Sequence, residues 1–163
     1  MSDRVGVMFN GKVDQVATPE QIYNKPRTKM VAAFIGNMNF FETECTGESS
    51  KTITVFHKDL GNLKLLKNNI FGKENPKITV GIRPENLKIN SKNLKKQSKS
   101  LTAKIAEKSF MGDTILYSIN LSGNNNNTYI ISVSDIKNSP NLIIGDEILV
   151  SFEEEDIVAY YKE

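Results

Sequence analysis

From residue 39 onward the chain consists of short runs in which apolar and polar residues alternate or apolar residues follow one another for one strand length. A period of two places successive side chains on opposite faces of a β-strand. Strands recurring every ~8–12 residues are typical of barrels and sandwiches. The runs lie at 41–45, 52–56, 63–66, 78–82, 87–89, 101–106, 114–121, 128–133, 147–152 and 157–161. The sequence therefore predicts a mainly β protein, a barrel or sandwich, over about 37–163.

Glycine, asparagine and aspartate separate these runs and are expected to form the turns between strands. The predicted turns lie at Gly47, Gly61-Asn62, Gly72, Gly112-Asp113, Gly123 with the Asn124–Asn127 run, and Gly145-Asp146.

The first 36 residues have a different pattern, which predicts a hairpin followed by two short helices. Asn10-Gly11 joins the strand-like runs 5–9 and 13–17, and both central positions of a tight hairpin turn favour such residues. Thr18 can cap the first helix, with Pro19 at its first position. A second helix is expected over Lys29–Ile35, stopped by Gly36, with Val31, Phe34 and Ile35 on one face.

The amino-acid composition does not indicate a nucleic-acid or membrane partner. The 163-residue chain has a net charge of +2 with 25% charged residues, so nothing requires nucleic acid or an anionic membrane. Cys45 is the single cysteine, which fits a reducing compartment and is interpreted as a small apolar strand residue. No apolar run approaches the ~20 residues of a membrane helix. We therefore expect a cytoplasmic protein without direct membrane insertion.

No catalytic, cofactor-binding or metal-binding residue is predicted. Gly6–Val13 approaches the phosphate-loop pattern, but Val13 lacks the hydroxyl that holds Mg²⁺ and the segment reads as a strand entering a turn. His57, the single histidine, is expected at the surface, and with one cysteine it cannot complete a zinc quartet. No ABC signature run occurs in the sequence. This chain is therefore not expected to hydrolyse ATP.

Arg83, Pro84 and Glu85 form the most specific local feature. Proline restricts the preceding residue to extended conformations and fixes its own φ, so the two charged side chains leave the strand end in set directions. A guanidinium can donate a planar fork to a carboxylate or to carbonyls. Two interpretations stay open: a structural clamp onto a neighbouring loop, or a contact across a subunit interface or to an effector.

Two charged runs are interpreted as solvated connections. Lysines crowd the segment near 90–100 without the aromatic residues that nucleic-acid grooves use, so a linker is expected there and no nucleic acid is predicted as partner. Glu153 to Asp156 is expected to form a turn between the last two strands.

The segment 1–42 and the motif Gly81-Ile82-Arg83-Pro84-Glu85 together resemble ATP-binding subunits of bacterial ABC importers, most closely the polyamine (spermidine/putrescine) branch. The resemblance implies that 1–36 is the tail of a nucleotide-binding domain and that 37–163 is an OB-like regulatory domain, called TOBE. ATP and Mg²⁺ would then belong only to a longer parent. The chain would pair with a second copy through its β-domain, and would reach the permease, and so the membrane periphery, through the ATPase domain.

The same resemblance places Phe110, Met111, Gly112 and Asp113 near the interface between two such domains; as an alternative, Phe110 and Met111 are core residues before a tight turn. A second function also stays open: a free-standing OB-type module for a small oxyanion or single-stranded nucleic acid, which leaves the first 36 residues unexplained. If Met1 is a natural start, the hairpin and helices lose the sheet that covers them. An apolar patch is then expected at Val5, Val7, Met8, Phe34 and Ile35.

Overall fold

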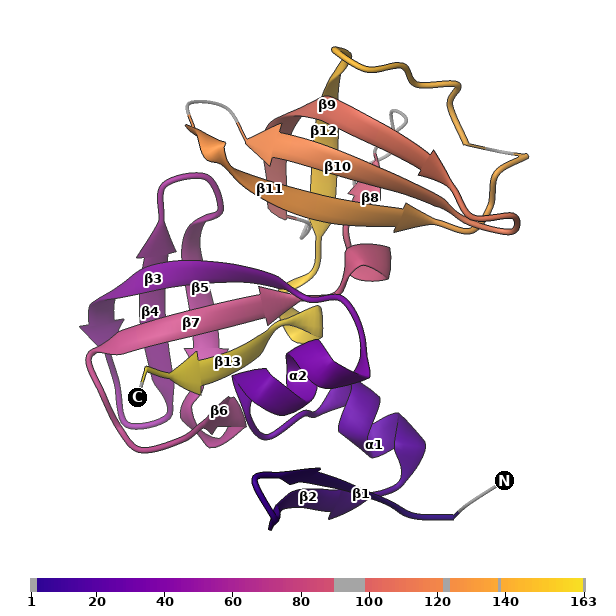
Figure 1. Ribbon diagram of the computed structural model, residues 1–163. Coiled ribbons are helices and arrows are strands. Elements are labelled where there is room, and N and C mark those ends of the chain that lie inside the picture. Colours follow the sequence, from indigo (N-terminus) through magenta and orange to yellow (C-terminus); the bar gives the residue numbers. More distant parts are fainter. Residues whose placement is uncertain (1–2, 90–98, 122–123, 138, 163) are drawn as a thin grey trace.

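The computed structural model describes the chain apart from residues 1–2, 90–98, 122–123, 138 and 163. A hairpin and two helices come first and strands make up most of the remainder, so the prediction of a mainly β protein is confirmed (Figure 1). The elements are β1 (Val5–Phe9), β2 (Lys12–Ala17), α1 (Pro19–Asn24), α2 (Lys29–Ile35), β3 (Asn39–Glu48), β4 (Thr52–His57), β5 (Gly61–Leu66), η1 (Lys67–Asn69), β6 (Ile70–Phe71), β7 (Lys77–Ile82), η2 (Pro84–Asn86), β8 (Lys88–Ile89), β9 (Lys99–Phe110), β10 (Ile115–Leu121), β11 (Asn124–Val133), β12 (Glu147–Phe152), η3 (Glu154–Asp156) and β13 (Val158–Tyr161).

Beyond the hairpin, the strands form two sheets. The six-stranded sheet has the order β5-β4-β3-β7-β13-β6, and the five-stranded sheet has the order β11-β10-β9-β12-β8. All pairings are antiparallel except that of β13 with the two-residue strand β6. In Figure 1 the helices lie beside the six-stranded sheet, and the β1–β2 hairpin lies at the end of the molecule farthest from the five-stranded sheet.

The chain crosses between the two sheets twice, and a 3₁₀ helix follows each crossing strand. After β7 it passes through η2 into β8, and after β12 it returns through η3 into β13. The acidic run Glu153–Asp156 thus lies between the last two strands, as predicted. Arg83 and its neighbours therefore sit at a corner where both sheets meet.

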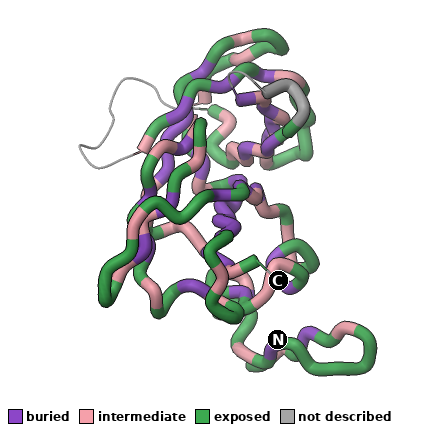
Figure 2. The backbone as a smooth tube through the Cα atoms, turned by 90° about the vertical axis from the view of Figure 1, so that its left-hand side faces the viewer, coloured by how far each residue is buried: buried purple, intermediate pink, exposed green. Residues whose placement is uncertain are grey.

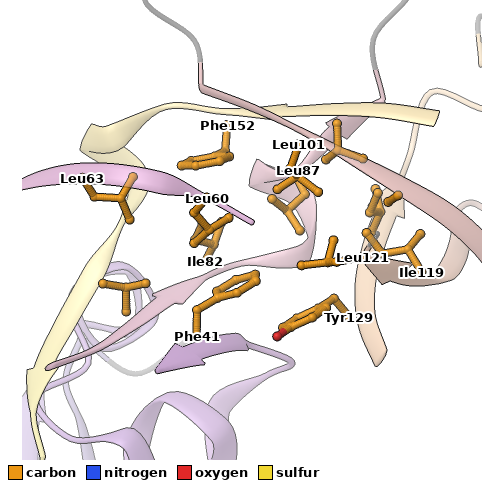
Figure 3. Close-up of a cluster of buried hydrophobic side chains, with 14 of the residues drawn as sticks. Phe41, Leu60, Leu63, Ile82, Leu87, Leu101, Ile119, Leu121, Tyr129 and Phe152 are labelled. Atoms are coloured by element: carbon orange, nitrogen blue, oxygen red, sulfur yellow. The ribbon is translucent and has the colours of Figure 1, made fainter. Parts of the chain in front are cut away.

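A single apolar core lies between the sheets (Figure 3). The six-stranded sheet contributes residues such as Phe41 and Ile82, and the five-stranded sheet contributes Leu101, Ile119 and Tyr129. Strand β10 shows strict alternation, with every second side chain buried, which is the pattern of a strand with one face on the core. Figure 2 shows buried residues along the inner parts of both sheets, with exposed residues in the turns.

The N-terminal elements form as their local signals predict. Asn10 and Gly11 have φ values of 50° and 75°, which is the backbone that a two-residue hairpin turn requires. Thr18 accepts a hydrogen bond from the Gln21 amide, and the Gln21 side chain accepts one from the Thr18 amide, completing a capping box. The second helix spans Lys29–Ile35 with Gly36 as its C-cap, as predicted.

The burial of these elements corrects two expectations. Val7 is 3% exposed because it packs with Ile22 and Val31 in a small core of its own. Val31 and Ala32 are the buried residues of α2, whereas Phe34 is 69% exposed. A seven-residue helix has fewer than two turns, and docking on the hairpin selects the face that is buried. The exposed apolar patch is therefore narrower than predicted, and Met8 and Phe34 are its exposed members.

Further corrections concern single positions. Gly47 lies within β3 at a register shift rather than in a turn, the Asn124–Asn127 run begins β11, and β6 was not predicted. Cys45 is exposed and not an apolar filler. His57 is half-buried rather than at the surface, because its ring packs edge-on against Phe41. Most of the predicted lysine linker, 90–98, lies outside the described residues, and β9 begins at Lys99.

None of the helices in the part of the chain that the structure describes combines the length and the apolar character needed to span a bilayer.

Candidate functional site

Arg83 lies at the end of β7, where the strand turns into η2. Its backbone is extended, with φ −65° and ψ 144°, as the following proline requires. The side chain is turned inward, so that only 4% of the residue is exposed. Pro84 is buried beside it and Glu85 is exposed.

The Arg83 guanidinium joins the ends of both helices to the sheet corner. Nη1 donates to the carbonyls of Ala32, Gly36 and Asn37 at 3.1, 3.0 and 2.9 Å, and Nη2 donates to the Tyr23 carbonyl at 3.0 Å. The last carbonyls of a helix lack partners within the helix and carry the negative end of its dipole. A buried cation therefore acts here as a shared C-cap for α1 and α2.

Tyr23 completes this arrangement. Its ring lies under the guanidinium, with 4.1 Å between the Arg83 Cζ and the ring centroid, and its hydroxyl donates to Glu85. Burial raises the pKa of Tyr23, and the hydrogen bond to Glu85 raises it further, while Arg83 opposes the shift. Among the described residues Arg83 Nε has no hydrogen-bond partner. The carbonyl partners of Arg83 support the clamp interpretation of the motif.

Glu42 forms a second connection between α2 and the six-stranded sheet. Its two carboxylate oxygens pair with Lys29 and Lys162 at 3.2 Å each, and Thr79 donates to the same group at 3.0 Å. Burial alone would raise the pKa of Glu42, but the hydrogen bonds from Lys162, Thr79 and Lys29 outweigh it and lower the pKa. All three charged side chains are substantially exposed, so this network contributes little to stability.

Tyr160 provides a third connection, because its buried hydroxyl donates to the Pro26 carbonyl at 3.0 Å between the two helices. We expect Tyr160→Phe to lower the free energy of unfolding by about 1 kcal/mol at pH 8, the usual net value of one hydrogen bond. Burial raises the pKa of Tyr160 above its ordinary value, with Arg83 opposing. The unfolded chain therefore ionises first, and wild-type stability falls as the pH rises above about 10.

The Tyr160→Phe variant lacks this ionisable group, so the stability gap between the two proteins narrows at pH 10.5–11. Urea titrations at pH 8 and at pH 10.5 measure the gap. A gap that widens with pH contradicts the assignment.

The two sheets are themselves joined by Asn39. Its Nδ2 donates to the Ile130 carbonyl at 2.8 Å, and its Oδ1 accepts from the Ile130 amide at 2.7 Å. The Asn39 side-chain amide thus makes the same pair of hydrogen bonds with Ile130 that a residue on a neighbouring strand would make with β11. Next to it, the Phe41 and Tyr129 rings stack with centroids 4.4 Å apart and an interplanar angle of 7°. The Asn39 hydrogen bonds and the Phe41–Tyr129 stack therefore connect the two sheets directly.

A cavity of about 380 Å³ lies beside the corner. Both crossings between the sheets line it: Arg83 and Asn86 from the first, Glu155 and Asp156 from the second. Burial raises the pKa of Asp156, and repulsion by Glu155 adds to the shift, whereas Lys88 lowers it. In the described part of the chain no three His, Cys, Asp or Glu residues are grouped so that they could hold a metal ion.

The second predicted group lies elsewhere, at the tip of the β9–β10 hairpin (Figure 1). Phe110 and Met111 are 67% and 62% exposed, so the alternative that they belong to the core is wrong. Gly112 has φ 95°, a backbone that favours glycine, and the Met111 amide donates to the Thr114 carbonyl to close the turn. That an interface forms at Phe110, Met111, Gly112 and Asp113 stays a prediction.

Several residues that connect the helices and the two sheets were not predicted from the sequence. Tyr23, Asn39, Glu42 and Tyr160 carry no local signal, because each partner lies far along the chain. The Asn39 contact spans 91 residues and the Tyr160 contact spans 134.

Comparison with known proteins agrees with this architecture. Residues 80–159 match the TOBE domain family. A spermidine/putrescine import ATP-binding protein, PotA, of Borreliella afzelii is 34% identical over 163 residues, which is 100% of this chain and 42% of the relative. The corresponding protein of Trichormus variabilis is 35% identical over 91 residues, 55% of this chain and 24% of the relative. The chain thus spans less than half the length of these curated relatives.

Among solved structures, the cytoplasmic molybdate-binding protein ModG, with molybdate bound, matches with a TM-score of 0.57 and 9% identity. The match covers 76% of this chain and 96% of that one, and at this identity it shows the fold alone. The OB-like character predicted for the β-region is confirmed by the TOBE match. The chain contains a TOBE domain and belongs to the family of ATP-binding subunits of ABC importers, whose TOBE-containing portion it matches.

Proposed function

We propose that this chain is the non-catalytic regulatory and dimerisation portion of an importer ATPase that drives uptake of the polyamines spermidine and putrescine. The observation that carries the proposal is the 34% identity to the Borreliella afzelii import protein over the whole chain. Two such chains would pair through the β-region. The ATPase and permease partners, with ATP and Mg²⁺, would belong to the longer parent subunit and its complex.

The mechanism we infer is interface coupling. Contacts that differ between the open and closed states of an ATPase pair shift the equilibrium between those states. The Arg83 corner supports this role, because it joins the two helices, which we propose to belong to the tail of a nucleotide-binding domain, to the sheets of the regulatory region. The exposed Phe110 and Met111 at the hairpin tip are the residues we propose for contact with the second copy.

The transported solute is tested by uptake in the source cells. We expect deletion of the gene for the parent subunit to abolish uptake of radiolabelled spermidine and putrescine, and re-expression to restore it, while maltose uptake stays unchanged. Unchanged polyamine uptake in the deletion strain would refute this part of the proposal.

Pairing is tested on the chain itself by sedimentation equilibrium. We expect a dimer that dissociates at least tenfold more readily in the Phe110→Ser, Met111→Ser variant. Ile143→Ser, Ile144→Ser is the matched control, because both of these apolar residues are also more than 60% exposed and lie outside the hairpin tip. Equal weakening by both double variants would exclude the hairpin tip as the contact.

The alternative of a free-standing module for an oxyanion or single-stranded nucleic acid is not favoured. The likeness to the molybdate-binding protein is one of fold, at 9% identity.

A further inference from the structure

A second cavity, of about 580 Å³, has a lining that does not include Arg83. Its walls come from the β1–β2 turn, the link between α1 and α2, the start of α2, the turn after β6 and the end of β13. This volume falls within the range of sites for small organic ligands. We call it the junction cavity, because its lining belongs both to the N-terminal elements and to the six-stranded sheet.

The charge around the junction cavity is positive. Lys12, Arg27, Lys29 and Lys162 line it, and Asp14 is the acidic residue in the described lining. The Asp14 carboxylate accepts a hydrogen bond from Thr28 at 2.7 Å, and Glu42 outside the lining is shared between Lys29 and Lys162. Four cations against these two carboxylates leave a net charge of +2.

Two of the four cations are available to a ligand. In the described structure neither Lys12 nor Arg27 forms an ion pair, and both side chains belong to exposed residues. A guanidinium presents a planar set of donors that matches phosphate oxygens, and an ammonium adds a further charge. A phosphate group, with about two negative charges, matches the net charge of the site.

The remaining lining indicates that the ligand has an apolar part. Phe9, Phe71 and Tyr161 contribute aromatic side chains that are partly exposed. Inorganic phosphate would occupy only a small part of 580 Å³ and would leave these rings in contact with water. Sites for small ligands usually combine such an apolar lining with a few placed polar groups.

We propose that the junction cavity binds a small phosphorylated organic anion, with its phosphate among the lysine and arginine side chains and its apolar part against the aromatic rings. Because the lining comes from residues between 9 and 30 and from residues 71–72 and 160–162, a bound ligand joins the hairpin and helices to the sheet. This inference goes beyond the proposed function, and its test uses the chain alone, so the identity of the transported solute does not affect the result.

The probe is 1-naphthyl phosphate, which carries both a ring system and a phosphate. Inorganic phosphate lacks the ring and 1-naphthol lacks the charge. By isothermal titration calorimetry we expect 1-naphthyl phosphate to bind at least tenfold more tightly than either of the others. Equal affinity for 1-naphthyl phosphate and 1-naphthol, or for 1-naphthyl phosphate and phosphate, would overturn the proposal.

The location is tested with Lys12→Gln, Arg27→Gln, which we expect to weaken binding of the probe at least tenfold. The control, Lys51→Gln, Lys104→Gln, removes the same charge from exposed lysines outside the cavity and should change the affinity less than twofold. Hydrogen exchange gives a second measure: the probe should slow exchange in residues 9–14 and 27–30. Equal loss in both variants, or capture by phosphatidylglycerol vesicles without probe binding, would overturn the proposal.

Discussion

Replacing Arg83 with methionine is expected to lower the free energy of unfolding by about 3–5 kcal/mol, the range for removing one member of a buried polar cluster. Methionine keeps the apolar length of the side chain but donates no hydrogen bond. Four carbonyls at the ends of α1 and α2 would lose their partner in a corner where Arg83 itself is only 4% exposed. Urea titration followed by circular dichroism measures the change.

Hydrogen exchange distinguishes local from global effects of Arg83→Met. We expect the first 36 residues to lose protection before the two sheets do, because the guanidinium is the common cap of the two helices. Arg83→Lys keeps the charge but not the planar fork, so it should recover only part of the loss. Arg27→Met removes an exposed arginine from the same region and should cost less than about 0.5 kcal/mol. Native protection of both helices in Arg83→Met would contradict the clamp.

The sequence predicts those parts of the molecule whose causes are local. The hairpin at Asn10-Gly11 follows from backbone preferences of two residues, and the start of α1 follows from Thr18, Pro19 and Gln21. In strand β10 every second side chain is buried, so the alternation along the strand identifies the face that packs on the core. The TOBE motif at residues 81–85 likewise lies in one short segment.

What the sequence leaves open is set by contacts between distant segments. From the sequence, the Arg83 guanidinium could bind a carboxylate, backbone carbonyls or a partner chain. It binds carbonyls because two helices, whose carbonyls lie 46–60 residues earlier in the chain, dock beside it. The two-residue strand β6 forms because it pairs with β13, about 90 positions later in the chain. Two residues are too few to show the alternating pattern that predicts a strand. The burial of Val31 and Ala32 rather than Phe34 depends on where the hairpin lies.

The second large effect is expected at the core between the sheets, from Phe41→Ala. Phe41 on β3 is 1% exposed and stacks on Tyr129 of β11, and Figure 3 shows these two rings side by side. The Phe41 and His57 rings form a T-shaped contact with their centroids 5.4 Å apart. Loss of a buried phenylalanine side chain leaves a cavity and costs about 3–5 kcal/mol. Because the stack joins the two sheets, the variant should lose near-ultraviolet tyrosine dichroism before its strands unfold.

Phe56→Ala is the matched control, since Phe56 lies on the neighbouring strand β4 but is 41% exposed. Its removal empties no enclosed space, so we expect a loss of about 1 kcal/mol or less. Equal destabilisation by the two variants would contradict the view that one shared core holds the sheets together. A shared core implies that the two sheets move as one body. A change at the Arg83 corner can then reach the β9–β10 hairpin tip through Asn39, Phe41 and β11. The proposed regulatory role requires such a connection.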